Sequence, residues 1–380
     1  MTTFLHVSDS IRSPEMRHEI AQAVMDPVIF ADVDGKRILA CSPFELAIFE
    51  KREDVIDQVI SFADIGQEEI VRDSSIPSSL ISSHLTLNLL QKLGESTVLV
   101  PGTFPTLLAD HLRSNGVNVQ VGQEEWVARR RRKAPWEVEG IERAQRAADT
   151  AMLTAARMLR DAERTAEGRL RFEGEILTAE LIREAMEAEL RTQGAESKNI
   201  LIQSGDAWTE IHGLGIGPIL PDQSVIIDCF PRDIATGCWS DMTRTFVSGT
   251  PSEDLRNLHG HVRKALDIAM SALKPGAKDA FTQVAEYFHS QGFPTQIHHE
   301  GPDPLFEGFM HALGHGVGLE VHERPNMGRR GDELLAGDVV AIEPGLYFPG
   351  VGGVRLEDTV LITDQGAEYI TDPFSYDLEP

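Results

Sequence analysis

The segment HALGHGVGLEVHE, residues 311–323, places three histidines among glycines and apolar residues. Four other apolar segments contain carboxylates: VIID ends at Asp228, SDMTRTF contains Asp241, VVAIEPGLY contains Glu343, and GVRLEDTVLIT contains Glu357. A charge inside an apolar strand is costly unless it is paired or binds a metal. One such carboxylate is usually salt-bridged or caps a turn, but four of them together with His315 indicate a shared site.

The alternation of side chains along a strand favours convergence of these groups. Thr243 shares a face with Asp241, because residues two apart in a strand point the same way. Arg355 shares a face with Glu357 for the same reason. The segment that ends at Asp228 would be the strand partner. We therefore expect the carboxylates to lie on one face of neighbouring strands.

The charge of this set suits two divalent metal ions. Four carboxylates and a neutral imidazole sum to about −4, and Arg244 and Arg355 are the nearby cations that could offset it. A site rich in carboxylate oxygens suits Mn²⁺, Co²⁺ or Fe²⁺ better than a thiolate-bound structural zinc. Two such ions close together hold a hydroxide, which is a nucleophile for amide hydrolysis. We expect two divalent ions, Mn²⁺ first, with Co²⁺ or Fe²⁺ as alternatives.

The motifs SDMTRTF, HALGHGVGLEVHE, IEPGLY and GVRLEDTVLIT resemble, in this order, those of the pita-bread metallopeptidases over about residues 199–370. That family includes methionine aminopeptidases, Xaa-Pro aminopeptidases and Xaa-Pro dipeptidases (prolidases). An α/β domain ahead of the catalytic domain resembles the proline-specific branch and creatinase. The resemblance implies an α/β N-terminal domain followed by an α+β pita-bread (creatinase/aminopeptidase-like) catalytic domain.

The resemblance also implies a role for each candidate metal ligand. Asp228 would bind one metal, and Asp241 and Glu357 would bridge the two metals. His315 and Glu343 would bind the other metal. Glu343 would be catalytic as well, because the family mechanism uses it as the proton shuttle.

Further residues match positions that the family uses around its substrate. His212 in EIHG and His322 would be catalytic, through a hydrogen bond to the scissile carbonyl, and His212 and His311 would shape the proline pocket. Arg355 would bind substrate, and Thr243 would hydrogen-bond to a ligand carboxylate. The alternative for the histidines is that they are ordinary loop residues.

The chain departs from the family pattern between the first two aspartates. The spacing from Asp228 to Asp241 is longer by two residues than is usual in the family, and Phe230 stands in place of a glycine. A longer hairpin loop can absorb two residues without moving the strands, so we keep Asp228 as the ligand. Asp233, in the irregular segment PRDIATG, is the competing candidate.

The order of predicted elements divides the chain into two domains joined by a linker. Residues 1–128 read as an α/β domain, with a hairpin at 27–42 turning at Asp34-Gly35 and a strand-helix-strand unit at 96–122. Residues 129–136 would be a linker, whose basic run RRRRK we interpret as solvated rather than as an anion site. Residues 137–380 open with helices at 136–163 and 177–194 and continue as strands, helices near 251–273 and 280–292, and strands again. We expect two similar halves in this domain.

Composition limits the partners and the compartment. The 380 residues carry 60 Asp and Glu against 35 Lys and Arg, a net charge of −25, which disfavours binding to nucleic acid or an anionic membrane. The first residues lack the pattern of an export signal, and no run approaches the ~20 apolar residues of a membrane span. Three cysteines without a CxxC pair suit a reducing compartment. We expect a cytoplasmic protein.

The expected activity is hydrolysis of the bond between any residue and proline, in a dipeptide or at the N-terminus of a peptide. The alternatives are a hydrolase or lyase on the same scaffold that is not specific for proline, creatinase-like chemistry without metal, or a non-catalytic pita-bread binding protein. The complete ligand set argues against the last two. The resemblance also implies a homodimer.

Overall fold

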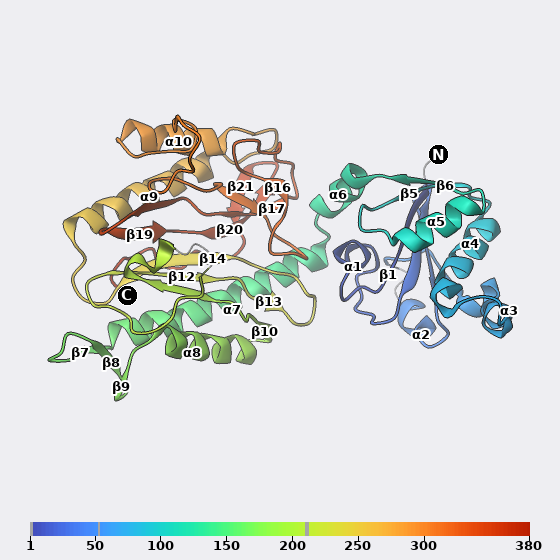
Figure 1. The fold of residues 1–380 in the computed structure, drawn as a ribbon, viewed down its shortest axis with the longest axis horizontal. Coiled ribbons are helices and arrows are strands. Elements are labelled where there is room, and N and C mark those ends of the chain that lie inside the picture. The colour runs from blue at the N-terminus through green and yellow to red at the C-terminus, as the bar shows by residue number, and fades with distance from the viewer. Residues whose placement is uncertain (1–2, 52–53, 210–212) are drawn as a thin grey trace. The chain divides into compact units, whose positions relative to one another are not determined.

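A computed structural model of the chain describes residues 3–51, 54–209 and 213–380. Its contacts divide the chain into two compact units, Met1–Arg130 and Arg131–Pro380. Figure 1 shows the course of the chain through both units. Each unit has its own buried apolar clusters, as expected for domains that fold around separate cores.

The first unit is a mixed six-stranded sheet covered by helices on both faces. Its strands lie in the order β4-β3-β2-β1-β5-β6. They are β1 (Thr3–Ser8), β2 (Val28–Val33), β3 (Lys36–Cys41), β4 (Gln58–Ser61), β5 (Thr97–Val100) and β6 (Asn118–Val121). The helices are α1 (Pro14–Ile20), α2 (Leu46–Phe49), α3 (Gln67–Arg72), α4 (Ile81–Leu93), α5 (Thr106–Ser114) and α6 (Gln123–Arg131), with 3₁₀ turns η1 (Phe62–Ile65) and η2 (Ser78–Leu80).

Two local predictions for this unit are confirmed. The β2–β3 hairpin turns at Asp34 and Gly35, which have φ of 53° and 87°, the positive values that a two-residue hairpin turn of this kind requires. Strands β5 and β6 pair in parallel across α5, as the strand-helix-strand pattern indicated. The α/β class expected for the N-terminal part is therefore confirmed.

Three residues of the basic run, Arg129, Arg131 and Lys133, form ion pairs and are not solvated, which corrects the sequence interpretation for them, whereas Arg132 is exposed. Within the first unit, Arg129 forms an ion pair with the buried Glu19. Within the second unit, Arg131 pairs with Asp338 at 2.6 Å, and Lys133 pairs with Glu323 with only 2% of the lysine side chain exposed. The acidic partners are distant in sequence, so a local charge pattern could not indicate them.

The second unit repeats one arrangement twice, a helix pair beside an antiparallel sheet. The first half has α7 (Pro135–Arg160), α8 (Ala179–Thr192) and the sheet β11-β12-β14, and the second half has α9 (Glu253–Ala272), α10 (Ala280–Ser290) and the sheet β16-β15-β17-β20-β21. Figure 1 shows the strands between the two helix pairs. The strands of the first half are β7 (Glu163–Arg164), β8 (Leu170–Phe172), β9 (Glu175–Ile176), β10 (Ala195–Glu196), β11 (Leu201–Ser204), β12 (Ser224–Cys229), β13 (Arg232–Asp233) and β14 (Met242–Val247), with η3 at Gly205–Thr209. The strands of the second half are β15 (Gly314–Gly316), β16 (Glu323–Asn326), β17 (Val339–Ile342), β18 (Gly345–Phe348), β19 (Gly352–Arg355), β20 (Asp358–Thr363) and β21 (Gly366–Tyr369).

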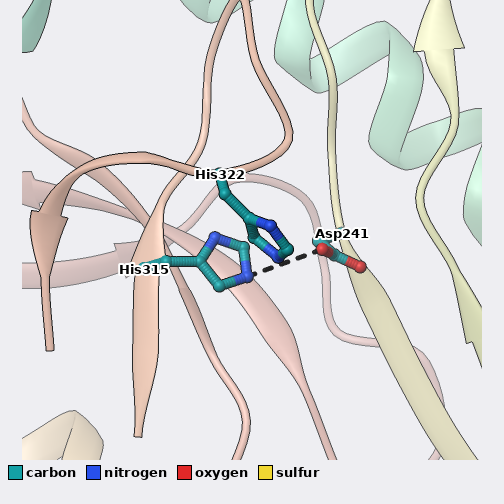
Figure 2. Close-up of side chains that lie close together, drawn as sticks. All are labelled: Asp241, His315 and His322. Atoms are coloured by element: carbon teal, nitrogen blue, oxygen red, sulfur yellow. Dashed lines mark ion pairs between the residues drawn. The ribbon is translucent and has the colours of Figure 1, made fainter. Parts of the chain in front are cut away.

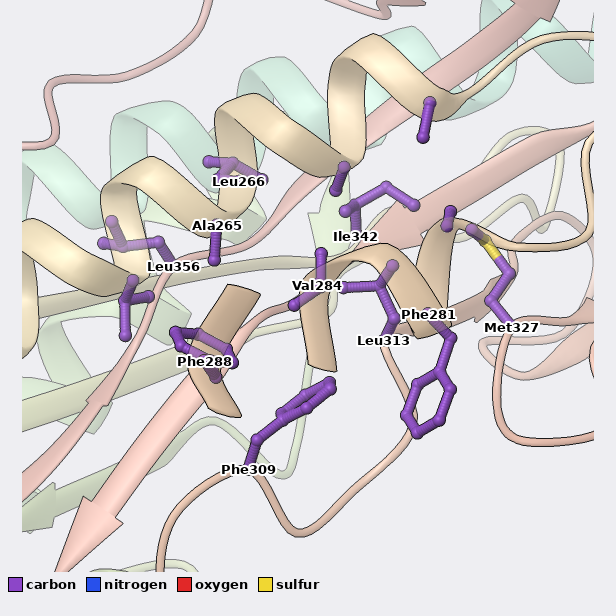
Figure 3. Close-up of a cluster of buried hydrophobic side chains, with 14 of the residues drawn as sticks. Ala265, Leu266, Phe281, Val284, Phe288, Phe309, Leu313, Met327, Ile342 and Leu356 are labelled. Atoms are coloured by element: carbon purple, nitrogen blue, oxygen red, sulfur yellow. The ribbon is translucent and has the colours of Figure 1, made fainter. Parts of the chain in front are cut away.

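Helix ends follow local chemistry, and helix faces form the core. Ser252 caps α9 by accepting a hydrogen bond from the backbone N–H of Leu255, as the sequence indicated. Helices α9 and α10 bury their apolar faces in one cluster with strands of the second half, in which Leu266 and Phe288 are fully buried (Figure 3). This packing holds the second sheet against its helices.

A backbone contact near Glu357 joins the two halves at their sheets. Strand β12 pairs with β14 so that Asp228 lies opposite Thr243, and an isolated bridge joins Thr243 to Glu357. The backbone N–H of Glu357 donates to the carbonyl of Thr243 at 3.0 Å. The ends of strands from both halves therefore come together at residues 228, 243 and 357.

The longer connection between Asp228 and Asp241 is an ordered hairpin loop. It contains β13, which pairs with β10, and a bridge from Arg232 to Trp239. The two extra residues are absorbed outside β12 and β14, as expected. Among the described residues, no helix combines the length and apolar character that a membrane span requires. All three cysteines are buried and unbridged.

Candidate metal centre

A cavity of about 990 Å³ opens where the two sheets of the second unit meet. Its walls come from both halves of the unit and combine carboxylates, histidines and apolar side chains. The lining residues include Leu201, Leu214, Asp228, Phe230, Asp241, His311, His315, Val321, His322, Arg324, Glu343, Arg355 and Glu357.

Three carboxylates form the first cluster. Asp228 lies near the end of β12, Asp241 directly precedes β14, and Glu357 lies between β19 and β20. One oxygen from each carboxylate lies within 4.8 Å of the others. Asp241 and Glu357 are buried, and Asp228 is partly exposed toward the cavity. Three negative oxygens this close repel one another strongly unless a cation or protons compensate.

The second cluster shares Glu357 with the first. One ligand atom each from His315, Glu343 and Glu357 also lies within 4.8 Å of the others. His315 is on β15, and Glu343 directly follows β17. Because the two clusters share Glu357, they define two adjacent candidate metal positions, and Glu357 lies next to both of them.

His315 has the orientation of a metal-binding imidazole. Its Nδ1 atom lies 3.1 Å from the carbonyl of Gly316, and a carbonyl can only accept, so Nδ1 carries the proton. Nε2 is then a lone-pair donor, and it points to Asp241 Oδ2 at 3.7 Å (Figure 2). A histidine ligand commonly donates its other N–H to a carbonyl in this way. His322 contacts the His315 ring edge-on at a centroid distance of 4.2 Å and forms a third cluster with His315 and Asp241.

The pKa values of these groups are shifted because several ionisable groups are buried close together. Burial, reinforced by neighbouring carboxylates, raises the pKa of Asp241 and of Glu357 well above their ordinary values. Burial and Asp228 raise the pKa of Glu343 to about 7, against the opposing effect of Arg355. Burial, with the nearby His322, lowers the pKa of His315 to about 4. Without a cation nearby, the raised pKa values mean that these carboxylates are protonated more readily than exposed ones.

Unpartnered oxygens show that divalent ions fit this set. The Oδ1 atoms of Asp228 and Asp241 are buried and accept no hydrogen bond. Buried carboxylate oxygens without a partner are rare in folded proteins and need an explanation. Oxygen ligands from four carboxylates with one imidazole nitrogen match the preferences of Mn²⁺, Co²⁺ and Fe²⁺.

Arg355 and Thr243 hold the carboxylates in place. Arg355 Nη2 contacts Asp228 Oδ2 at 2.5 Å, and its Nε donates to Thr243 Oγ1 at 3.2 Å. The Thr243 hydroxyl donates in turn to Glu357 Oε2 at 2.6 Å. Only 6% of the Arg355 side chain is exposed. Arg355 thus orients Asp228 directly and Glu357 through Thr243. It also lines the cavity, and its contact with a substrate stays a prediction.

His311 is held in one tautomer on the cavity wall. Its Nδ1 donates to the carbonyl of Ala312 at 2.7 Å, so Nε2 accepts from the hydroxyl of Tyr347 at 3.0 Å. Arg355 Nη1 donates to the same hydroxyl at 3.0 Å. Burial, with Arg355 nearby, lowers the pKa of His311 to about 4, so the ring is neutral at pH 7.

Residues 139–364 match the model of metallopeptidase family M24. The chain belongs to this family. An Xaa-Pro dipeptidase from Pyrococcus furiosus is 34% identical over 245 residues, which cover 63% of this chain and 62% of that protein. The aligned stretch therefore spans less than two thirds of that relative. The family resemblance inferred from the motifs is confirmed.

Solved structures extend the likeness in fold to the whole chain of this M24 protein. The prolidase from Pyrococcus furiosus aligns over 98% of this chain and 97% of its own, with a TM-score of 0.71 and 24% identity. An X-Pro aminopeptidase from Thermotoga maritima aligns over 99% and 97%, with a TM-score of 0.75 and 22% identity. The predicted fold, an α/β N-terminal domain with a pita-bread catalytic domain, is confirmed.

Nearly all candidate site residues of the M24 chain lie around one cavity. The five expected ligands, His311, His322 and Arg355 line it, and Thr243 contacts Glu357 behind its wall. His212 lies outside the described residues. Asp233 does not line the cavity. Its carboxylate instead accepts hydrogen bonds from Arg143 and Thr236.

Tyr347 was not among the site residues predicted from the sequence. Its hydroxyl joins His311 to Arg355, and its ring packs against Trp208 at a centroid distance of 5.6 Å. A signal was present, because a tyrosine four residues after Glu343 continues the motif IEPGLY into β18. Nothing local indicated which groups its hydroxyl would contact.

Proposed function

We propose that this M24 protein hydrolyses Xaa-Pro peptide bonds with the help of two divalent metal ions. The observation that carries the proposal is the pair of carboxylate clusters sharing Glu357 in a cavity with His311 and His322. In the proposal, Asp228 would hold one ion and His315 and Glu343 would hold the other, with Asp241 and Glu357 contributing to both sites. Mn²⁺ is the first candidate, with Co²⁺ or Fe²⁺ as alternatives.

The ions, when bound, would supply a water molecule of lowered pKa and polarise the scissile carbonyl. The residues of the chain supply the remaining chemistry. Glu343, which lines the cavity next to His315 and Glu357, accepts a proton from the attacking water and returns it to the leaving nitrogen. His322 and His212 donate hydrogen bonds to the carbonyl oxygen as negative charge develops there.

Selection of proline follows from the chemistry of its amide. An Xaa-Pro bond is a tertiary amide without an N–H, so a site that offers no acceptor there favours proline. Leu201, Leu214 and Phe230 give the cavity an apolar wall for a rigid ring, and His311, held by Tyr347, forms another wall. The Xaa-Pro dipeptidase of Pyrococcus furiosus supports the same substrate class.

Partners and compartment complete the proposal. The substrate is a dipeptide or peptide with proline at its second position, and the chain acts as a homodimer in the cytoplasm. Three buried cysteines without a disulfide support a reducing compartment. The charge of −25 supports neither nucleic acid nor an anionic membrane as a partner.

The decisive experiment compares Ala-Pro, Ala-Pro-Ala and Ala-Ala as substrates of metal-stripped protein, with Mn²⁺, Co²⁺ or Fe²⁺ added back. We expect cleavage of at least one proline substrate, loss with a chelator, and recovery with one of the metals. The preference between dipeptide and tripeptide identifies the dipeptidase or the aminopeptidase. Equal cleavage of Ala-Ala would contradict proline specificity alone. Metal binding without any cleavage would favour a binding protein.

A further inference from the structure

Arg244 is a fully buried cation behind the candidate metal centre. It lies on β14 between Thr243 and Thr245, so its side chain leaves the strand on the face opposite to that of Thr243. Its side chain is 1% exposed, and it does not line the cavity. None of the roles proposed for the catalytic site uses this residue.

The guanidinium of Arg244 uses all five of its N–H groups. Nη1 donates to the carbonyls of Thr243 at 2.9 Å and of Glu357 at 2.7 Å. Nη2 donates to Asp358 Oδ1 at 2.7 Å and to the carbonyl of Phe374 at 3.0 Å, and Nε donates to the carbonyl of Ser375 at 3.0 Å. One side chain thus joins β14, residues 357–358 and segment 374–376.

Tyr376 completes the attachment of this segment. Its hydroxyl donates to Asp358 Oδ2 at 2.6 Å, so both oxygens of Asp358 are engaged, one by Arg244 and one by Tyr376. Two guanidinium groups lie close to the Tyr376 ring, that of Arg244 at 4.5 Å and that of Arg263 at 4.1 Å from its centroid. Cation–π contacts of this kind stabilise both partners.

The contacts of Arg244 act on the two backbone positions that set the Glu357 carboxylate. The carbonyl of Thr243 accepts from Arg244 and also from the N–H of Glu357. On the opposite face, the Thr243 hydroxyl donates to Glu357 Oε2. The strand of Thr243 and the backbone of Glu357 are therefore locked together from both faces, at the carboxylate that the two clusters share.

We propose that Arg244, held by segment 374–376, is a positioning residue that fixes the Glu357 carboxylate for metal binding. The inference rests on the proposed function, because it assigns Glu357 to the metals. Groups that orient a ligand without touching the metal change metal affinity by roughly 10- to 100-fold when they are lost. Arg244 acts in this way through the backbone.

The test measures Mn²⁺ binding to metal-stripped protein by calorimetry, with circular dichroism to show that each variant is folded. Arg244→Lys keeps the charge near Asp358 but has three donors in place of five. We expect its Mn²⁺ dissociation constant to rise about 10-fold or more. Tyr376→Phe removes one donor from Asp358, and we expect a rise of at least about 3-fold. With Ala-Pro, kcat should fall in both variants and KM should change little.

Arg256→Gln is the matched control. Arg256 pairs with Glu379 and so also ties down the end of the chain, but it contacts none of Thr243, Glu357 and Asp358 in the described contacts. Its exposed ion pair contributes little, so Mn²⁺ affinity should stay within about 2-fold of wild type.

If Arg244→Lys unfolds, Tyr376→Phe decides the outcome. Folded variants that bind Mn²⁺ as tightly as the wild type would show that Arg244 only stabilises the fold, and the inference would be wrong. A wild-type protein that binds none of Mn²⁺, Co²⁺ and Fe²⁺ would overturn the proposed function and this inference together. The two failures are therefore distinguishable.

Discussion

Replacing Glu357 by glutamine should have opposite effects on stability with and without metal. The substitution keeps the shape of the side chain and its acceptor for the Thr243 hydroxyl, which lies at 2.6 Å. It removes the charge that the two candidate clusters share. We expect the metal-free variant to be more stable than the metal-free wild type and to respond less to Mn²⁺.

The magnitude follows from the crowding of the carboxylates. At the 4.8 Å limit of the clusters, two unit charges repel by roughly 3 kcal/mol at an effective dielectric constant of about 20. Protonation limits the total repulsion energy, because the folded protein binds protons instead of keeping every carboxylate charged. With an ordinary pKa of 4.5, one carboxyl kept protonated at pH 8 costs at most about 5 kcal/mol. Removing Glu357 should therefore stabilise the metal-free protein by about 1 to 5 kcal/mol at pH 8.

The direction with pH follows from the raised pKa. Burial and the Glu343 carboxylate raise the pKa of Glu357 in the folded state, so the folded state binds more protons than the unfolded state above the ordinary value. Stability then decreases as pH rises from about 4.5 through the folded pKa. The difference in stability between the metal-free wild type and the metal-free variant should be small at pH 5 and large at pH 8.

Thermal unfolding in a chelator and in Mn²⁺, at pH 5 and pH 8, measures both effects. Saturating one site at 100 times its dissociation constant adds about 2.7 kcal/mol to wild type, which is several degrees in Tm for a unit of this size. Glu368→Gln, an exposed position on β21, is the control. A Glu357→Gln variant less stable than wild type in chelator at pH 8, or equally stabilised by Mn²⁺, would refute the reasoning.

Three further predictions test other parts of the molecule. Asp228→Asn should lower activity by orders of magnitude while Asp233→Asn, which is remote from the clusters, stays near wild type; peptidase assays showing the reverse would move the ligand into the loop. His322→Ala should lower kcat by roughly 10²-fold with the metals retained, whereas His311→Ala should mainly raise KM, and steady-state kinetics with metal analysis separates them. Burial lowers the pKa of His6 from 6.5 to about 4, so the unfolded state binds its proton first, and stability should fall by up to about 3 kcal/mol as pH falls from 6.5 to 4. Urea unfolding of His6→Gln should show a flatter pH profile, and an unchanged slope would contradict this assignment.

Local chemistry in the sequence determined the elements and the kind of site. Hairpin and helix-capping signals such as Asp34-Gly35 and Ser252 act over a few residues, so a sequence reading finds them directly. Carboxylates inside apolar strands were recognisable as costly, and their number and charge indicated divalent ions before any fold was known. Strand alternation predicted that Asp241 lies with Thr243 and Arg355 with Glu357, but in the structure Asp241 directly precedes β14 and Glu357 lies between β19 and β20, outside the strands to which that rule applies.

Tertiary structure alone decided how those groups are held. Arg355 engages Asp228, 127 residues away in the chain, and Arg131 engages Asp338, 207 residues away, where the sequence suggested a solvated linker. The contacts of Tyr347 and Arg244 also join residues that are distant in the chain. Each depends on which backbones the two sheets bring together. Such contacts arise from the packing of distant segments, which short-range periodicity does not encode, whereas turns, caps and buried charges are properties of a few neighbouring residues.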